Sequence, residues 1–377
     1  MRRKASWALS TGILLFFLFR CTTDRNNMVG SGFFERGNLG SENRMTFRPA
    51  ASDTSFRLSS QTGYSSYLYF GCHSGVEAKT LIRFDTLSLS AKADSLVLAF
   101  PWMNAYSESG LSFTAEVFAW THGWGEETFL WDSLSAGGTG TLLGTRTIST
   151  NDTTMDVVLS RDWAERLVHP KQPSSQYGIL LQTRNGDGLV QCHSIQSGTS
   201  AELKIYSSAG MQTVDPAADV FVSNASRPLP PDRLVVSNGA ATRSLLRFDL
   251  SGLDRRMTVN LAQLTFHVDA SVSFPKILEP FGANLFPVTD TVWAIPDINV
   301  SDDNAVTSFV DGDRLAFNIT PLVQEWIAGS SSNHGLLMIG QSEVSDLSGM
   351  AFFASTADSS QRPALELYYS LPPSTPF

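Results

Sequence analysis

The chain is poor in cysteine, in charged residues and in long apolar runs. Its 377 residues include 3 cysteines, and 17% are Asp, Glu, Lys or Arg. So few cysteines exclude a small fold held together by a disulfide framework. The formal net charge is −9. An acidic chain is a poor match for a nucleic-acid backbone, so we expect no nucleic-acid partner.

The sequence also lacks the short motifs of common catalytic sites. It contains no nucleophile elbow, no HExxH zinc motif and no phosphate-binding P-loop. The six histidines follow no metal-ligand spacing. These absences favour a protein that binds or builds over an enzyme.

The N-terminus has the pattern of an export signal. Met1–Lys4 is positively charged, and Trp7–Phe19 is an apolar stretch shorter than the ~20 residues that span a membrane. Cys21 follows in a sequence that resembles a bacterial lipobox, although Arg20 stands where such boxes have a small residue. We predict lipidation of Cys21, with a plain signal or an uncleaved anchor as alternatives.

Export and lipidation would place the chain on the outer membrane or the cell surface of a bacterium, held by a lipid anchor. The signal carries Arg2, Arg3, Lys4 and Arg20 and no acidic residue, so its removal lowers the formal charge from −9 to −9 − 4 = −13. The mature protein is therefore more acidic than the full chain.

What the sequence does contain is an internal repeat. Thr80–Leu87 (TLIRFDTL) is matched by Ser244–Leu250 (SLLRFDL), and Tyr177–Leu181 (YGILL) by His334–Met338 (HGLLM). Three further matches follow the same order: Asp53–Phe56 with Asp219–Val222, Leu68–Phe70 with Leu234–Val236, and Glu202–Tyr206 with Ala364–Tyr368. Ordered matches of this kind predict two copies of one domain.

The repeat predicts the domain boundaries. Each copy is long enough to bury its own core. We expect a signal peptide over 1–21, a flexible tether over 22–46, the first repeat over 47–207, a linker over 208–217, the second repeat over 218–370 and a tail over 371–377.

Alternating apolar residues predict strands throughout both repeats. In the second repeat, Leu246 and Phe248 share one strand face, while Arg247 and Asp249 share the other. Clusters of Gly, Asn, Asp, Ser and Pro separate many such short runs. The sequence therefore predicts an all-β protein with two tandem antiparallel β-sandwiches of jelly-roll type.

Each repeat also allows one short helix. Thr320 as N-cap, apolar residues at helical spacing and Gly329 as terminator predict the second. The first begins at Ser160 and stops before Pro170. We interpret the tryptophan in each helix, Trp163 and Trp326, as a core residue.

The order of these signatures resembles the bacterial DNRLRE-type domains, which are related to carbohydrate-binding modules. The resemblance covers nearly all of residues 50–370 and includes the stretch Trp124–Trp131 (WGEETFLW). The second repeat keeps only Thr291–Trp293 of that stretch. The resemblance implies extracellular β-sandwiches and a polysaccharide ligand.

Aromatic and polar residues in the first repeat form the candidate ligand site. Sugar rings stack on exposed aromatic side chains, but the same side chains could belong to the core. The candidate residues are Asn104, Trp120, Trp124, Glu126 and Trp131. A second candidate is an Arg/Asp pair that both repeats carry on a strand, Arg83 with Asp85 and Arg247 with Asp249. Such a pair could bind a sugar or form a structural ion pair.

Two further sites have a functional and a structural interpretation. Cys72 and Cys192 either form a disulfide, as oxidising conditions allow, or remain as two buried thiols. Oxygen-rich turns either bind structural calcium or are simply solvated; their residues are Asp302, Asp303, Asp311 and Asp313. We expect no other cofactor.

Three functions remain open. We favour a non-catalytic cell-surface or periplasmic protein whose tandem sandwiches bind polysaccharide. The alternative is a structural or assembly module of the cell envelope without a glycan ligand. A cryptic polysaccharide lyase is the least favoured. The sequence does not identify a protein partner.

Overall fold

The computed structural model describes residues 43–371, apart from 48, 60, 86–88, 90, 108–109, 111, 136, 150, 153, 165–177, 225–228 and 275–278. Regular structure in this part of the chain is mostly antiparallel β-strand, as predicted. The predicted signal peptide (1–21), residues 22–42 and residues 372–377 lie outside it. None of the helices it includes has the length and apolar character needed to cross a membrane.

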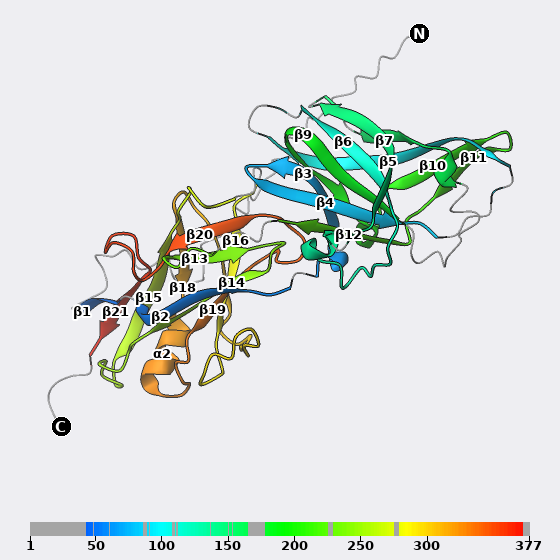
Figure 1. The fold of residues 1–377 in the computed structure, drawn as a ribbon. Helices are drawn as coiled ribbons and strands as arrows, with labels where there is room; N and C mark the ends of the chain where they lie inside the picture. Colours follow the sequence, from blue (N-terminus) through cyan, green and yellow to red (C-terminus); the bar gives the residue numbers. More distant parts are fainter. Residues whose placement is uncertain are drawn as a thin grey trace, which may run out of the picture. The chain divides into compact units, whose positions relative to one another are not determined.

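We call strands β3–β12 sandwich one. They form a ten-stranded antiparallel sheet around one apolar core (Figure 1). Strand β5 joins the two parts of this sheet, because its first half pairs with β8 and β10 and its second half with β9. The strands are β3 (Tyr67–His73), β4 (Val76–Arg83), β5 (Ala93–Tyr106), β6 (Ser112–Trp120), β7 (Thr139–Ser149), β8 (Thr154–Leu159), β9 (Gly178–His193), β10 (Glu202–Ser207), β11 (Gly210–Val214) and β12 (Ala218–Ser223).

We call strands β1, β2 and β13–β21 sandwich two. One sheet has the order β1-β21-β15-β18, and the other has the order β17-β16-β19-β14-β13-β20 with β2 paired to β14. The apolar side chains between the two sheets form one core. The elements are β1 (Asn43–Phe47), β2 (Pro49–Arg57), β13 (Arg233–Ser237), β14 (Thr242–Phe248), β15 (Thr258–His267), β16 (Gly282–Pro287), β17 (Val306–Phe309), β18 (Arg314–Asn318), α2 (Thr320–Ala328), β19 (Leu336–Gly340), β20 (Gly349–Phe353) and β21 (Ala364–Ser370).

The repeated Arg-Phe-Asp strand places its side chains as the alternating pattern predicts. Ile82 and Phe84 lie in the core of sandwich one, and Leu246 and Phe248 lie in the core of sandwich two. The arginine between each pair points to the opposite face of the sheet, where its guanidinium lies over a tryptophan. The predicted strand faces are therefore confirmed.

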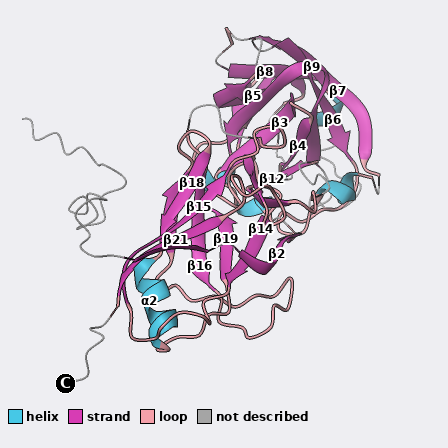
Figure 2. Ribbon diagram, turned by 90° about the vertical axis from the view of Figure 1, so that its left-hand side faces the viewer, coloured by secondary structure: helices cyan, strands magenta, loops and turns pink. Residues whose placement is uncertain are grey.

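The second predicted helix is confirmed as α2, which packs against β15 at one end of sandwich two (Figure 2). It ends at Gly329, whose φ of 79° suits a residue without a side chain. The predicted cap is wrong by one position, because Thr320 is the first helical residue. Its hydroxyl instead bonds Asn318 and the amide of Ala262.

Of the first predicted helix, residues 162–164 are helical and residues 165–177 lie outside the described part. Trp163 is buried against Phe84, and Trp326 is buried in the core of sandwich two. Both tryptophans are therefore core residues, as the sequence indicated.

The strand that opens each repeat pairs with the other repeat, a feature that the sequence analysis did not predict. β2 belongs to the first repeat and pairs with β14, where Asp53 lies opposite Leu246. β12 belongs to the second repeat and pairs with β4, where Asp219 lies opposite Ile82. Since the two registers are equivalent, the exchange is reciprocal.

The exchanged strands are fixed by their repeated aspartates. The carboxylate of Asp53 accepts hydrogen bonds from the Ser355 amide at 2.6 Å and from the Ser355 hydroxyl at 2.9 Å. The carboxylate of Asp219 accepts one from the Ile195 amide at 2.9 Å. Each aspartate therefore ties its strand to the sandwich formed mainly by the other repeat.

Side-chain size explains why the strands exchange. Phe221 of β12 packs edge-on against Tyr69 of β3, with the ring centroids 5.0 Å apart. The equivalent residue of β2 is Ser55, whose hydroxyl bonds the Val235 amide at 2.8 Å and Ser244 Oγ at 2.9 Å. Ser55 beside Tyr69 would leave a void, and close-packed interiors disfavour voids.

The predicted tether and linker both contain strand residues. Residues 43–46, assigned to the tether, belong to β1, which pairs with β21. Half of the predicted linker 208–217 forms β11, which pairs with β10 as a hairpin. Both segments are therefore shorter than the composition suggested, because backbone pairing can recruit polar residues at a sheet edge.

Buried contacts further join the two sandwiches. Leu347, from the segment between β19 and β20, is part of the core of sandwich one. Beside it, the Tyr69 hydroxyl donates to Asp346 at 3.2 Å and accepts from the Gln191 side chain at 2.7 Å. Asp346 also accepts from the Asn238 side chain at 3.3 Å. Residues 43–377 accordingly form one compact unit.

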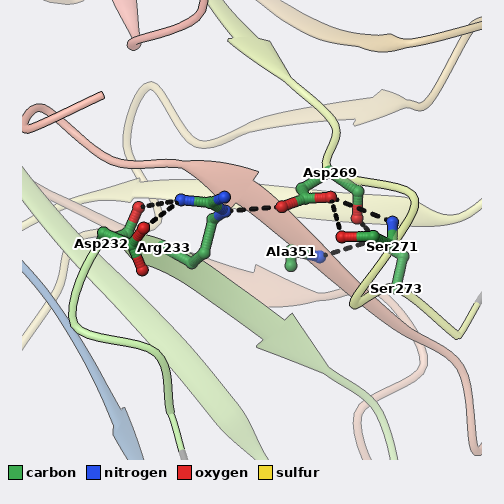
Figure 3. A network of polar contacts seen from close by, with 6 residues as sticks. All are labelled: Asp232, Arg233, Asp269, Ser271, Ser273 and Ala351. Atoms are coloured by element: carbon green, nitrogen blue, oxygen red, sulfur yellow. Dashed lines mark hydrogen bonds and ion pairs between the residues drawn. The ribbon is translucent and has the colours of Figure 1, made fainter. Parts of the chain in front are cut away.

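A second polar network stabilises sandwich two (Figure 3). Arg233 donates to Asp269 at 2.7 Å and to Asp232 at 2.6 Å. Burial opposes ionisation of Asp269, but hydrogen bonds from Ser271 and Arg233 outweigh it and lower the pKa of Asp269. The hydroxyl of Ser273 completes the network by accepting from the Ala351 amide of β20. These groups satisfy one another, so their role is structural.

Candidate ligand-binding site

The predicted tryptophan site lies on the outer face of sandwich one. The chain between β6 and β7 folds back over strands β4, β6, β9 and β12 and buries a small apolar cluster there. The buried members are Leu81, Trp120, Phe129, Leu180, Val220 and Val222, and Trp124 and Trp131 lie at the edge of the cluster.

Trp120 is not available to a ligand. It is 2% exposed and packs edge-on against Phe129, with ring centroids 5.6 Å apart. Gly138 has a φ of +126° and lies so close to the indole that an added Cβ would come within 2.5 Å of it. Trp120 therefore belongs to the core, which corrects its assignment as a ligand platform.

Trp124 and Trp131 are half-buried, and each has a cation over its ring. The Arg83 guanidinium lies 5.5 Å from the centroid of Trp124, and Lys79 Nζ lies 5.4 Å from that of Trp131. Both cations come from β4, where alternate residues share a face. These contacts are stabilising cation–π pairs, and they cover part of each ring.

The second repeat has a reduced form of the same arrangement. Arg247 lies 5.8 Å from the centroid of Trp293, whose indole donates to the His334 carbonyl at 2.8 Å. Neither arginine of the two predicted Arg/Asp pairs makes an ion pair with its aspartate among the described residues. Asp249 instead accepts a hydrogen bond from the Ser251 amide at 3.0 Å.

Glu126 is engaged with the exchanged strand. One carboxylate oxygen accepts from the Asp219 amide and from the Gln196 side chain, each at 3.1 Å. Burial, with a contribution from the Glu126 charge, raises the pKa of Asp219 to about 7 against the opposing hydrogen bond from Ile195. Glu126 thus anchors β12. No local sequence pattern predicts this role, because Asp219 lies far from Glu126 in the chain.

Asn104 lies in a different part of sandwich one. It sits in the second half of β5, opposite Gln191 of β9, and donates to that side chain at 2.8 Å. Gln191 in turn bonds Tyr69. Asn104 therefore belongs to the polar network that joins the sandwiches, and the described contacts do not bring it to the tryptophans.

A pocket of about 310 Å³ opens beside Trp131. Trp131 and Asp132 line it from the 3₁₀ helix Trp131–Leu134, and Arg57 and Ser59 line it from the end of β2. The remaining lining includes Leu58, Val222, Ser223, Gly239 and Ala240. Sequence reasoning missed Arg57 and Ser59, because only the strand exchange brings them beside Trp131.

This pocket combines an aromatic surface with hydrogen-bond acceptors and donors. Asp132 is exposed and can accept hydrogen bonds. Burial lowers the pKa of Arg57, but the ordinary pKa of a guanidinium is so high that Arg57 stays protonated and donates hydrogen bonds. Its volume lies at the lower end of the ~300–1,000 Å³ range of small-molecule sites. Chemically, the pocket suits a small polyhydroxylated ligand.

The two cysteines described do not form a disulfide. Both thiols are free. Cys192 lies opposite Leu68 on the paired strands β3 and β9, whereas Cys72 lies opposite Gly188. The two cysteines are thus four positions apart along the pair, about 13 Å at the usual rise, beyond disulfide reach. Cys192 is buried and Cys72 is half-buried, and burial raises the pKa of both thiols, which disfavours the reactive thiolate form. Cys21 lies outside the described residues.

The four aspartates of the calcium prediction lie in two exposed turns. Asp302 and Asp303 precede β17, whereas Asp311 and Asp313 lie in the turn that connects β17 to β18 in the opposite sheet. In this turn, Arg314 pairs with Asp313 at 3.6 Å. Among the described residues, no three His, Cys, Asp or Glu side chains converge as metal ligands. The turns therefore lend calcium binding no geometric support.

Comparison with known proteins shows little. No family model matches the chain, and no curated protein matches it. Among solved structures, the C-terminal domain of the AgI/II polypeptide BspA of Streptococcus agalactiae is similar at 12% identity with a TM-score of 0.23, over 85% of this chain and 91% of that one. Another solved structure, described as BspA_C_mut, is similar at 9% identity with a TM-score of 0.19, over 86% of this chain and 91% of that one. The DNRLRE resemblance stays a prediction.

Proposed function

We propose that this protein is a non-catalytic, exported carbohydrate-binding protein that takes a sugar unit of a polysaccharide into the pocket beside Trp131. The observation that carries the proposal is the lining of that pocket. Trp131 offers a ring for the apolar face of a sugar, and Asp132, Arg57 and Ser59 offer an acceptor, a bidentate donor and a hydroxyl.

The residues that line the Trp131 pocket agree better with sugar binding than with hydrolysis of a glycosidic bond. Glycoside hydrolysis uses two carboxyl groups on either side of the scissile bond. The described lining supplies one, Asp132. The export signal and Cys21 support a place on the bacterial surface, where a lipid anchor would hold the protein close to extracellular polysaccharide.

A glycan array with the whole chain, followed by titration of the oligosaccharides that bind, tests the proposal. Trp131→Ala should weaken binding by about 1 kcal/mol or more, the scale of an aromatic contact. Trp131→Phe should restore most of it. Trp293→Ala is the matched control, because Trp293 also lies under an arginine but is not part of the pocket lining. Equal losses in Trp131→Ala and Trp293→Ala would refute the site.

A structural role in the cell envelope is the second candidate. The reciprocal strand exchange and the buried Tyr69–Asp346 contact favour it, because they join two sandwiches more firmly than ligand binding requires. The array separates the two functions. If the folded protein binds no glycan, the structural role is favoured.

A further inference from the structure

A second pocket, of about 710 Å³, lies in sandwich two and is separate from the Trp131 site. It opens where β14 ends, between the turn that follows this strand and helix α2. Its apolar lining comprises the buried Phe248, Trp326 and Ile327 and the half-buried Leu250 and Leu253. The polar part of the lining comprises Ser52, Arg247, Asp249, Ser251, Arg255 and Asn333.

The charge of this pocket is opposite to that of the chain. Arg247 and Arg255 are both exposed, and neither has a carboxylate partner among the described contacts. The adjacent Arg256, by contrast, pairs with Asp254 at 2.9 Å. Asp249 is the one carboxylate of the described lining, so the pocket carries +2 − 1 = +1 in a chain of net charge −9. The Arg247 guanidinium lies over the Trp293 ring, a contact that leaves its N–H groups without a carboxylate partner. Guanidinium groups that lack a carboxylate partner favour an anionic ligand.

Asn333 adds an acceptor to these donors. Its amide nitrogen donates to the Phe248 carbonyl at 2.8 Å, which sets the orientation of the side chain. Its amide oxygen is buried and has no hydrogen-bond partner among the described residues. Buried polar atoms nearly always have a partner, so a small shift of the lining that uncovers this oxygen would let it accept a hydroxyl from a bound molecule.

We propose that this pocket binds an oxyanion carried by a hydroxyl-bearing ligand. The phosphate or carboxylate group would bind Arg255 and Arg247, and a hydroxyl of the same ligand would donate to Asn333. Leu250 and Leu253, which lie over the buried end of the core, provide the apolar surface against which the ligand packs. This site differs from the Trp131 pocket in its residues and in the charge of its ligand.

Calorimetric titration of the whole chain tests the proposal with four probes. Glucose 6-phosphate and glucuronate combine an oxyanion with hydroxyls, glucose has the hydroxyls alone, and inorganic phosphate has the anion alone. We expect saturable binding of at least one of the first two, weaker binding of phosphate and none of glucose. The preferred probe distinguishes a phosphate ligand from a carboxylate ligand. Absence of binding by both charged sugars, or equal binding of glucose, would overturn the proposal.

The variant Arg255→Gln should weaken binding of the preferred probe by about tenfold. Arg256→Gln is the matched control and should leave it unchanged, because that arginine is paired outside the pocket. Asn333→Leu should weaken binding of the charged sugar but not of phosphate. Trp131→Ala should have no effect, which keeps this test independent of the proposed function. An Arg255→Gln protein that is folded and binds normally would also overturn the proposal.

Discussion

Truncation of Phe221 should destabilise sandwich one, although this residue belongs to the second repeat in the sequence. Phe221 is fully buried in β12, packs against Tyr69 and is part of the core of sandwich one. Removal of a buried phenylalanine side chain typically costs about 3–5 kcal/mol. We therefore expect Phe221→Ala to lower the free energy of unfolding of the whole chain by that amount.

Removal of the whole strand should have a larger effect. Val220, Phe221 and Val222 of β12 are each at most 4% exposed. Full burial of such side chains contributes roughly 1.5–3 kcal/mol each, or about 5–9 kcal/mol for the three. A domain is typically stable by only about 5–15 kcal/mol. A fragment that follows the sequence repeat, 47–207, should therefore be barely folded, whereas 58–223 should fold.

Urea denaturation followed by tryptophan fluorescence measures this difference, since Trp120 and Trp163 are buried in sandwich one. Both fragments lack Leu347 of the second repeat, so they differ in β2, in β12 and in β11, a mostly exposed edge strand. We expect a cooperative transition for 58–223 and a broad or absent one for 47–207. If 47–207 unfolds as cooperatively and at the same midpoint, β2 can replace β12, and the packing argument for the exchange is wrong.

Three further outcomes are expected. Because the pKa of Asp219 is about 7 in the folded chain against 3.8 ordinarily, its contribution to stability is complete below pH ~4 and is lost as pH rises to ~7; Asp219→Asn should remove this pH dependence of the unfolding free energy, and an unchanged profile would contradict the shift. Tyr69→Phe leaves Asp346 without one buried donor and should cost about 1–3 kcal/mol in urea denaturation; no loss would mean that the bond contributes nothing. Phe248→Ala should cost about 3–5 kcal/mol, and a loss below ~1 kcal/mol would contradict its place in the core.

Much of the fold could be predicted because it follows from local periodicity. The alternation around Phe84 and Phe248 predicts which side chains reach the core, since successive residues of a strand point to opposite faces. The apolar spacing before Gly329 likewise predicts α2, and the ordered matches predict two similar sandwiches. Each of these signals lies within a few residues of the element that it predicts.

The candidate site was less predictable, because alternation does not tell whether the outer face of a sheet is covered. Trp120, Trp124 and Trp131 have the composition of a sugar platform, yet a fold-back segment buries the first and cations from β4 cover part of the other two. Glu126 and Asn104 were grouped with them by proximity in the sequence, but their partners come from distant strands.

By itself, the sequence determined the all-β class, the two-fold repeat, the inward faces of the strands and the position of helix α2, because short-range patterning encodes each of them. Only the tertiary structure decided which repeat each opening strand would complete. That choice depends on whether Phe221 or Ser55 packs beside Tyr69, a comparison between residues far apart in the chain. The same exchange brings Arg57 beside Trp131 and so forms the pocket on which the proposed function rests.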